Sequence, residues 1–318
     1  MPVALRDALP VSGTNDAPVS APTPDNWLSI AALGLIWGGT FAVVAVALEG
    51  YGPFTVAASR TALGAVALCA LAAALRRPPP RMTPVLAAFL AALGVLNAAL
   101  PFTLLAWGQQ HVASAFAGLS MAMLPLAILP LSHVFVPGDR MTVCKTSGFV
   151  LGIVGAALLF LPAFGDGGSE LAAAGRLACL GAVLSYAVSS ILTRRCPPMD
   201  PIWLSAAILV AGTLSLLPVA VWREGLPGPA APGPMAAILF LGLIPTGLAA
   251  LLRVRVIRTA GPSFMTLVNY QVPVWSMVFG AALLGEALPR RFFVALALIL
   301  AGLMVSQWAT LAGLRRRP

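Results

Sequence analysis

The sequence predicts an all-α integral membrane protein in which ten transmembrane helices form two inverted-topology repeats of five helices. Composition is the first reason: 59% of the 318 residues are hydrophobic and only 9% are charged, which soluble domains of this length do not tolerate. Internal duplication is the second reason, because residues 93–126 match residues 241–274 at a constant spacing of 148. The match aligns three pairs: Gly94 with Gly242, Phe116 with Phe264, and Pro125 with Pro273.

Ten apolar windows are long enough to cross a bilayer, for which a helix needs about 20 residues. Run length and flanking Gly, Pro and charged residues place them at 27–48, 53–75, 84–107, 113–135, 143–162, 173–193, 201–222, 235–257, 263–284 and 292–311. Each copy holds five windows, and because five is odd the second copy must enter the bilayer from the opposite side. Such inverted repeats are typical of secondary transporters, which bind their solute between the halves near the midplane.

The segments outside the windows are short and polar. Residues 1–26 are rich in Pro, Ser, Thr and Asp and contain no apolar run, which predicts a disordered cytoplasmic tail and no cleaved signal peptide. A first five-helix repeat is predicted at 27–162 and a second at 173–311, followed by a basic tail at 312–318. The short loops leave no room for a soluble catalytic domain.

The distribution of basic residues predicts the orientation. With a cytoplasmic N-terminus, 14 of the 19 Lys and Arg residues fall on the cytoplasmic side, which fits the positive-inside rule with both termini cytoplasmic. Four fall on the outer side, and Arg60 lies within a window. The net charge of +9 is thus a topology signal, and because the arginines are scattered over separate short loops we expect no nucleic-acid binding.

Residues that hold metals or perform catalysis are sparse. None of the four cysteines has a CxxC spacing, so we expect neither a disulfide nor a metal site. The two histidines, His111 and His133, are predicted on opposite sides of the bilayer, and no Gly-rich nucleotide-binding loop is present. We therefore expect no enzyme activity, no catalytic residue, no cofactor and no ATP-driven transport.

Three aromatic residues are predicted near the membrane midplane. Trp37 and Trp275 lie ten and twelve residues into their windows, and Tyr186 aligns with Trp37 at a spacing of 149. A buried indole N–H needs a hydrogen-bond partner, which a packed helix or a bound solute can provide. Equivalent depth favours a substrate-binding role for all three, and ordinary helix packing is the alternative.

Polar side chains gather on the sixth and ninth windows. Helical spacing places four of them on one face: Tyr186, Ser189, Ser190 and Thr193. Hydroxyls in membrane helices also bond to their own backbone, so Ser189 is a candidate with a structural alternative. Amides are costly in hydrocarbon unless satisfied, and the ninth window carries three further substrate-binding candidates: Asn269, Tyr270 and Gln271.

Further candidates come from the third, fourth and eighth windows. Met121 and Met123 are pliable and suit a cavity that accepts several apolar side chains, although core filling would look the same. Asn97 and Thr246 lie near prolines that bend helices. Prolines at corresponding positions of both copies would let these helices flex, as alternating access requires, and four are predicted as hinges: Pro101, Pro125, Pro245 and Pro273.

Arg60 is the charge that lies most plainly within a window. Seven residues beyond Pro53, it would lie roughly 10 Å below the outer surface. An uncompensated charge there costs at least about 2.5 kcal/mol. Three interpretations are open: snorkelling to the surface, an ion pair with Glu49 or Glu286, or attraction of a substrate carboxylate.

Several short motifs occur in a characteristic order along the chain. They are Trp37-Gly38, Pro101-Phe102, Trp107-Gly108-Gln109, Pro125, Gly261, Asn269-Tyr270, Pro273, Gly285-Glu286 and Gly302. Together they resemble the EamA-type members of the drug/metabolite transporter superfamily across the whole chain. The resemblance implies a basket of helices 1–4 and 6–9 around a central cavity, with helices 5 and 10 to one side. It also implies export of small metabolites across a bacterial inner membrane, with amino-acid exporters among the relatives. One departure is Gly138-Asp139, where the family usually has Gly-Glu; the carboxylate is kept.

These features predict a secondary transporter that exports small metabolites, in particular neutral or aromatic amino acids or their analogues, by alternating access without ATP. None of the ten acidic residues is predicted at membrane depth, where a coupling ion would bind, so we expect facilitated diffusion. The alternatives are a broad-specificity effluxer of drug-like compounds and a membrane scaffold that does not transport. The predicted partners are a small-molecule solute and the lipid bilayer, and the sequence does not indicate an oligomeric state.

Overall fold

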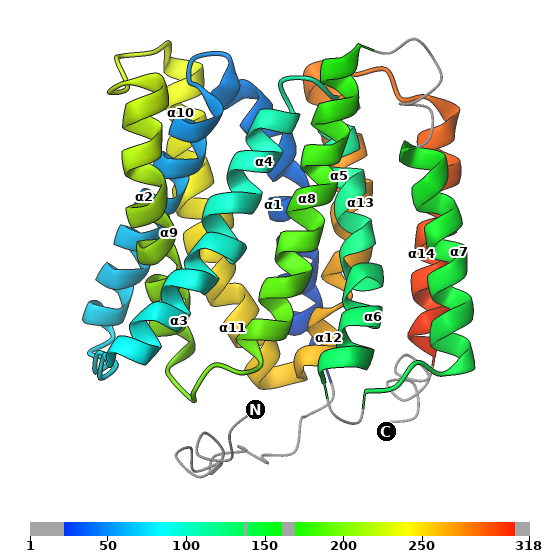
Figure 1. Cartoon of the computed structure of the whole chain (residues 1–318), viewed down its shortest axis with the longest axis horizontal. Coiled ribbons are helices and arrows are strands. Elements are labelled where there is room, and N and C mark those ends of the chain that lie inside the picture. The colour runs from blue at the N-terminus through cyan, green and yellow to red at the C-terminus, as the bar shows by residue number, and fades with distance from the viewer. Residues whose placement is uncertain (1–21, 137–138, 161–168, 309–318) are drawn as a thin grey trace.

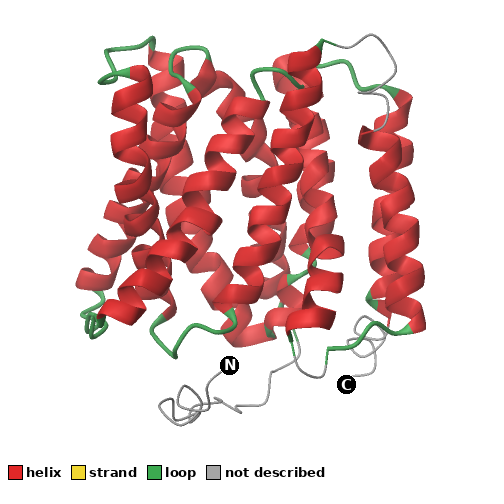
Figure 2. Ribbon diagram, in the orientation of Figure 1, coloured by secondary structure: helices red, strands yellow, loops and turns green. Residues whose placement is uncertain are grey.

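The computed structural model describes residues 22–136, 139–160 and 169–308, which form helices and connecting loops without a strand (Figures 1 and 2). The helices of the first half are α1 (Pro24–Leu48), α2 (Pro53–Ala74), α3 (Pro84–Gly94), η2 (Val95–Ala99), α4 (Leu100–Gly108), α5 (Ser114–Ser120), η3 (Met121–Met123), α6 (Leu124–Phe135) and α7 (Val143–Phe160). Those of the second half are α8 (Glu170–Thr193), α9 (Pro201–Glu224), α10 (Pro232–Leu241), η5 (Gly242–Leu248), α11 (Ala249–Ala260), α12 (Pro262–Met265), α13 (Val268–Leu284) and α14 (Arg290–Ser306).

Eight helical stretches within the described residues are long and apolar enough to cross a membrane. They are Pro24–Leu48, Pro53–Ala74, Pro84–Gly108, Ser114–Phe135, Val143–Phe160, Glu170–Thr193, Pro201–Glu224 and Pro232–Ile257. Val268–Leu284 is a shorter apolar helix, and α14 has 17 residues. The prediction of an all-helical membrane protein is confirmed, and each predicted window carries helix over its described part.

The predicted tails fall mostly outside the described residues. Residues 312–318 lie wholly outside them, as do residues 1–21 of the first tail. Of the described residues, α1 begins at Pro24, three residues before the predicted window 27–48. A proline in the first turn needs no backbone N–H there and has a φ suited to a helix start.

Local sequence explains where several helices begin and end. Thr83 accepts a hydrogen bond from the N–H of Leu86 at the start of α3, and Asp200 accepts from Ile202 at the start of α9. Both are residues that satisfy free N–H groups at a helix N-terminus. Gly285 ends α13 with a φ of 65°, a left-handed conformation that glycine adopts without a steric cost.

Helices of the first half pack mainly against helices of the second half. The most extensive pairs across this divide are α7 with α14, α2 with α9, α1 with α13, and α4 with α8. Small residues allow the approach: a methyl group at Gly38 in α1 would overlap the side chain of Trp275 in α13. The helices α7 and α14 pack on each other at one side of the bundle (Figure 1), with Gly148 against the backbone of Gly302.

Two carboxylates join the halves at the end of the bundle where α1 meets α2. Glu224, the last residue of α9, accepts hydrogen bonds from the backbone N–H groups of Phe54 and Thr55 at 3.0 and 2.8 Å. Glu286, after α13, accepts from those of Ser114 and Ala115 at 2.6 and 2.9 Å. A carboxylate at a helix N-terminus satisfies free donors and the helix dipole together.

Candidate functional site

Two π-helical segments, η2 and η5, interrupt equivalent helices of the two repeats, since Asn97 in η2 aligns with Pro245 in η5 at the 148-residue spacing. Single π-helical turns are rare and often occur at functional sites. In η2 the N–H of Leu100 donates to the carbonyl of Val95, so the next residue in this pattern, Pro101, would donate to Leu96. Proline has no N–H, and the Leu96 carbonyl is therefore free to accept from elsewhere.

Each π-helical segment is hydrogen bonded to the first helix of the other repeat. The Ser185 hydroxyl of α8 donates to the Leu96 carbonyl at 2.7 Å. The Trp37 indole N–H of α1 donates to the Pro245 carbonyl at 3.2 Å. Trp37 thus has the partner that its buried N–H requires, and the packed helix provides it. What Trp37 can offer a solute is the face of its ring.

Asn97 extends this polar contact along α8. Its side-chain N–H donates to the Ser189 hydroxyl at 3.0 Å, and that hydroxyl donates to the Tyr186 carbonyl at 3.0 Å. The other two hydroxyls of the predicted polar face, Ser190 and Thr193, donate to carbonyls one turn earlier in α8. Ser190 and Thr193 therefore bond to the backbone of their own helix, whereas the Ser189 hydroxyl connects α8 with η2.

Arg60 in α2 is buried, with 8% of its surface exposed. Its guanidinium carbon lies 3.8 Å from the centre of the Phe102 ring of α4, and that ring lies 6.5 Å from the Tyr186 ring of α8. The structure shows neither snorkelling nor an ion pair of Arg60 with a described residue, and attraction of a substrate carboxylate stays a prediction. Of the two expected partners, Glu286 is held by backbone N–H groups of α5 and Glu49 is exposed.

Thr246 brings η5 against α2 one turn from Arg60. Because Pro245 cannot donate to the Leu241 carbonyl, the Thr246 hydroxyl does so at 2.8 Å. The methyl group of Thr246 faces Gly64, where an added methyl group would overlap it. Arg60 and Gly64 are four residues apart and so lie on one face of α2.

The predicted residues of the ninth window lie against α1. Gln271 packs on Gly34, and Trp275 packs on Gly38 and stacks on Phe279 with ring centres 5.9 Å apart. No hydrogen bond within the described part of the chain links them to the Arg60 and Asn97 groups. Two neighbours complete the window: Asn269 is half-buried, and the Tyr270 hydroxyl is buried without a hydrogen-bond partner.

The two predicted methionines diverge in the 3₁₀ turn η3. Met121 packs on the main core cluster, to which Trp37 and Tyr186 also belong. Met123 packs with Leu126 and Ile299 on the side of α7 and α14, away from the other candidates. The predicted hinge prolines are buried; Pro101 and Pro125 are the second residues of α4 and α6, while Pro245 and Pro273 lie inside η5 and α13.

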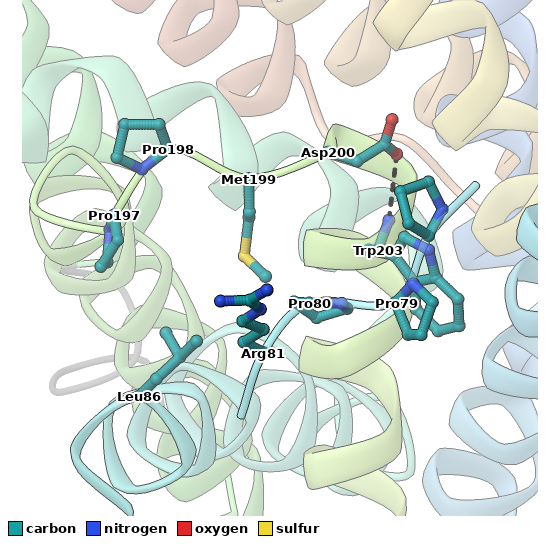
Figure 3. Close-up of a pocket in the computed structure, with 10 residues that line it drawn as sticks. Pro79, Pro80, Arg81, Leu86, Pro197, Pro198, Met199, Asp200 and Trp203 are labelled. Atoms are coloured by element: carbon teal, nitrogen blue, oxygen red, sulfur yellow. Dashed lines mark hydrogen bonds between the residues drawn. The ribbon is translucent and has the colours of Figure 1, made fainter. Parts of the chain in front are cut away.

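A surface cavity of about 410 Å³ lies at the opposite end from the Glu224 and Glu286 contacts (Figure 3). It is bounded by the loop between α2 and α3 and the loop between α8 and α9, and prolines form much of its lining. Arg77 and Asp200 form an ion pair of 3.5 Å beside it, and the Trp203 indole donates to the Arg77 carbonyl at 3.2 Å. None of the predicted substrate-binding residues lines it.

Comparison with known families settles the class of protein. Residues 27–161 and residues 173–307 each match the model of the EamA-like transporter family. The chain belongs to this family. Its two matched segments are the two copies seen in the sequence, so the two-repeat architecture and the resemblance noted from the motifs are confirmed.

Among similar EamA-like proteins is a probable terminal-alkyne amino-acid exporter of Streptantibioticus cattleyicolor, 29% identical over 88% of this chain and 92% of that protein. An S-adenosylmethionine/S-adenosylhomocysteine transporter of Chlamydia trachomatis is 28% identical over 84% of each chain. An uncharacterized inner membrane transporter of Escherichia coli is 25% identical over 85% of this chain and 87% of its own. All three relatives are named as transporters or exporters.

A solved crystal structure shares the fold, with a TM-score of 0.64 and 20% identity, covering 90% of this chain and 99% of the other. The protein is thus a multi-pass membrane protein of a bacterial transporter family. Transporter relatives imply a small-molecule solute and a membrane environment.

Proposed function

We propose that this protein is a secondary transporter that exports neutral or aromatic amino acids or their analogues from the cytoplasm across a bacterial inner membrane. Ten transmembrane helices in two inverted repeats, with both termini cytoplasmic, would carry the solute by alternating access without ATP. The observation that most supports the proposal is the reciprocal contact between repeats, in which Trp37 bonds to η5 and Ser185 bonds to η2. Transporters with inverted repeats bind solute at such an interface, beside interrupted helices.

The chemistry around this interface suits an amino acid with an apolar side chain. Aromatic rings of Trp37, Phe102 and Tyr186 come from three helices, and Met121 belongs to the same core. The Asn97 side-chain oxygen has no hydrogen bond within the described residues, although its N–H is engaged. That oxygen is an acceptor for a solute amino group. The relative named as a probable amino-acid exporter agrees with this choice.

Facilitated diffusion follows from where the acidic side chains are. Two half-buried carboxylates, Glu224 and Glu286, each accept two backbone hydrogen bonds at helix ends. Neither is free to bind a proton or sodium ion between the repeats, the usual place for a coupling ion. Export would then be driven by a high cytoplasmic concentration of the solute.

Growth rescue of an exporter-deficient bacterial host tests the function. Expression should restore growth on toxic concentrations of phenylalanine, leucine or their analogues and lower the intracellular solute content. Drug-like cations without an amino-acid backbone should gain no resistance. Resistance to those cations with no effect on amino acids would establish the broad-specificity effluxer instead, and no effect on any solute would favour the scaffold.

A further inference from the structure

A buried cation without a buried anion lies between the two repeats. Arg60 is exposed over only 8% of its surface, and its Nε–H is fully buried with no hydrogen-bond partner among the described residues. A guanidinium stays charged in proteins and offers five N–H donors in one plane. A buried charge of this kind is costly unless something pairs with it.

None of the carboxylates of the described residues pairs with Arg60. Three form ion pairs with Arg255, Lys145 and Arg77, respectively: Asp25, Asp139 and Asp200. Two accept backbone N–H groups at helix N-termini: Glu224 and Glu286. Two are exposed: Glu49 and Glu170. None of the seven is therefore available to Arg60.

The side chains around Arg60 hold it in place without neutralising it. The Phe102 ring covers one face of the guanidinium at 3.8 Å, which is a favourable cation–π contact. Tyr186 packs edge-on against Phe102 with ring centres 6.5 Å apart. Because Phe102 occupies a face of the guanidinium, the N–H groups at its edge remain to bind a ligand. A planar carboxylate matches that edge with two parallel hydrogen bonds.

We propose that Arg60 binds the carboxylate of the transported solute, with Phe102 orienting the guanidinium and Tyr186 lying beside the bound anion. This inference rests on the proposed function, because it names the group by which the exported solute is recognised. The solute supplies the counter-charge that the described residues do not provide. Matched compounds without a carboxylate, such as the amide or the decarboxylated amine, are then poor ligands.

Binding to the purified protein in lipid nanodiscs tests the proposal without requiring transport. The probes are phenylalanine, phenylpropionate, phenylalaninamide and phenethylamine, and the readout is the dissociation constant from ligand-induced thermal stabilisation. The two carboxylates should bind the wild type roughly ten-fold or more tightly than the two compounds without one, as expected for a charge-assisted hydrogen bond. Arg60→Gln should remove this difference while the weak binding of phenylalaninamide is unchanged.

Arg60→Lys gives a second, less disruptive variant that keeps the charge and loses the planar fork. It should retain part of the preference for carboxylates, and it replaces Arg60→Gln if that variant does not accumulate. Equal binding of phenylalanine and phenylalaninamide by the wild type would overturn the proposal, as would an unchanged preference in Arg60→Gln, or absence of binding by both carboxylates. If carboxylates bind through Arg60 but the host exports no amino acid, the proposed function fails and this inference stands.

Discussion

The π-helical segments η2 and η5 occupy equivalent places in the two repeats but are held by different side chains. In η2 the free carbonyl of Leu96 accepts from the small hydroxyl of Ser185, and Asn97 adds an amide contact to α8. In η5 the acceptor is the carbonyl of Pro245 and the donor is the large indole of Trp37. The backbone distortion has been kept in both copies, while the chemistry at each has diverged.

The packing behind the two segments differs in the same way. Gly64 of α2 faces Thr246 of η5, and Gly212 of α9 faces Ala98 of η2; both pairs are related by the 148-residue spacing. The contact of Gly64 with Thr246 is tight and includes a hydroxyl group, whereas the contact of Gly212 with Ala98 is apolar. A solute bound between the segments would meet an amide on one side and aromatic and hydroxyl groups on the other. Such a site can orient an amino acid, whose two ends also differ.

The largest effect is expected from making η5 a regular helix. Pro245→Ala restores an N–H that can donate to the Leu241 carbonyl, in place of the Thr246 hydroxyl. Removing the π-helical turn would rotate the following residues and withdraw the acceptor from Trp37. Efflux should fall roughly ten-fold, while the free energy of unfolding falls by no more than about 0.5–1.5 kcal/mol, the cost of the lost Trp37 hydrogen bond.

Pro101→Ala is the matched change at η2, where the new N–H would compete with Ser185 for the Leu96 carbonyl. Its effect on efflux should be smaller, because Pro101 lies after the π-helical turn and not within it. Equal loss in both variants would remove the functional difference between the segments.

The next prediction compares the two hydrogen-bond donors between the repeats, Trp37 and Ser185. Trp37→Phe and Ser185→Ala each remove one hydrogen bond between repeats and should each lower the free energy of unfolding by about 0.5–1.5 kcal/mol. Ser185 is buried, so its loss should leave efflux kinetics unchanged. Trp37 is half-buried, so Trp37→Ala, which removes the ring as well, should raise the apparent KM. Unchanged kinetics in Trp37→Ala would place the solute elsewhere.

A smaller effect is expected from the packing behind η5. Gly64→Ala puts a methyl group onto the Thr246 methyl, and overpacking of this kind costs about 1–3 kcal/mol. Thr246→Ser removes that methyl, keeps the hydroxyl donor, and should restore most of the lost thermal stability in the double variant. Gly212→Ala should cost less, because its added methyl would lie 3.0 Å from Ala98. Gly228→Ala is the control, with nothing within 4 Å; failure of the rescue would refute the steric explanation.

The smallest effect is expected from breaking an ion pair at the surface. Arg255, in the helix that follows η5, forms an ion pair of 3.2 Å with Asp25 of α1, and both side chains are more than half exposed. Exposed pairs contribute up to about 1 kcal/mol, so Asp25→Asn should leave melting temperature and efflux nearly unchanged. A large loss of transport would mean that the surface contact between α1 and α11 controls η5.

The helices could be predicted from the sequence because apolar run length and flanking residues act locally. The windows 84–107 and 235–257 lie within a few residues of their helices; Pro245 lies inside η5, and Pro101 follows the end of η2 in α4. The π-helical form of η2 and η5 depends on hydrogen-bonding groups in the other repeat, which a local sequence pattern does not reveal. Ser185 was missed for that reason: it lies one turn before Ser189 at the edge of the same face of α8, but its acceptor, the Leu96 carbonyl, is in the other repeat.

Arg60 shows the other limit of the sequence. Its burial was predicted from its place in an apolar window, whereas its neighbours were not. Glu286 was a reasonable ion-pair partner by depth alone, but it meets two N–H groups at the start of α5. Phe102, from a helix distant in sequence, lies against Arg60 instead. Long-range packing decides such contacts.

The most direct test of the account is solute counterflow in proteoliposomes that contain only this protein. Vesicles loaded with unlabelled phenylalanine and diluted into labelled phenylalanine, with no pH or sodium gradient, should show a transient accumulation of label that Trp37→Ala and Tyr186→Ala strongly reduce. Equilibration without overshoot would indicate a channel, and no entry would contradict transport of this solute. Accumulation driven by an imposed pH or sodium gradient, without preloaded phenylalanine, would contradict facilitated diffusion.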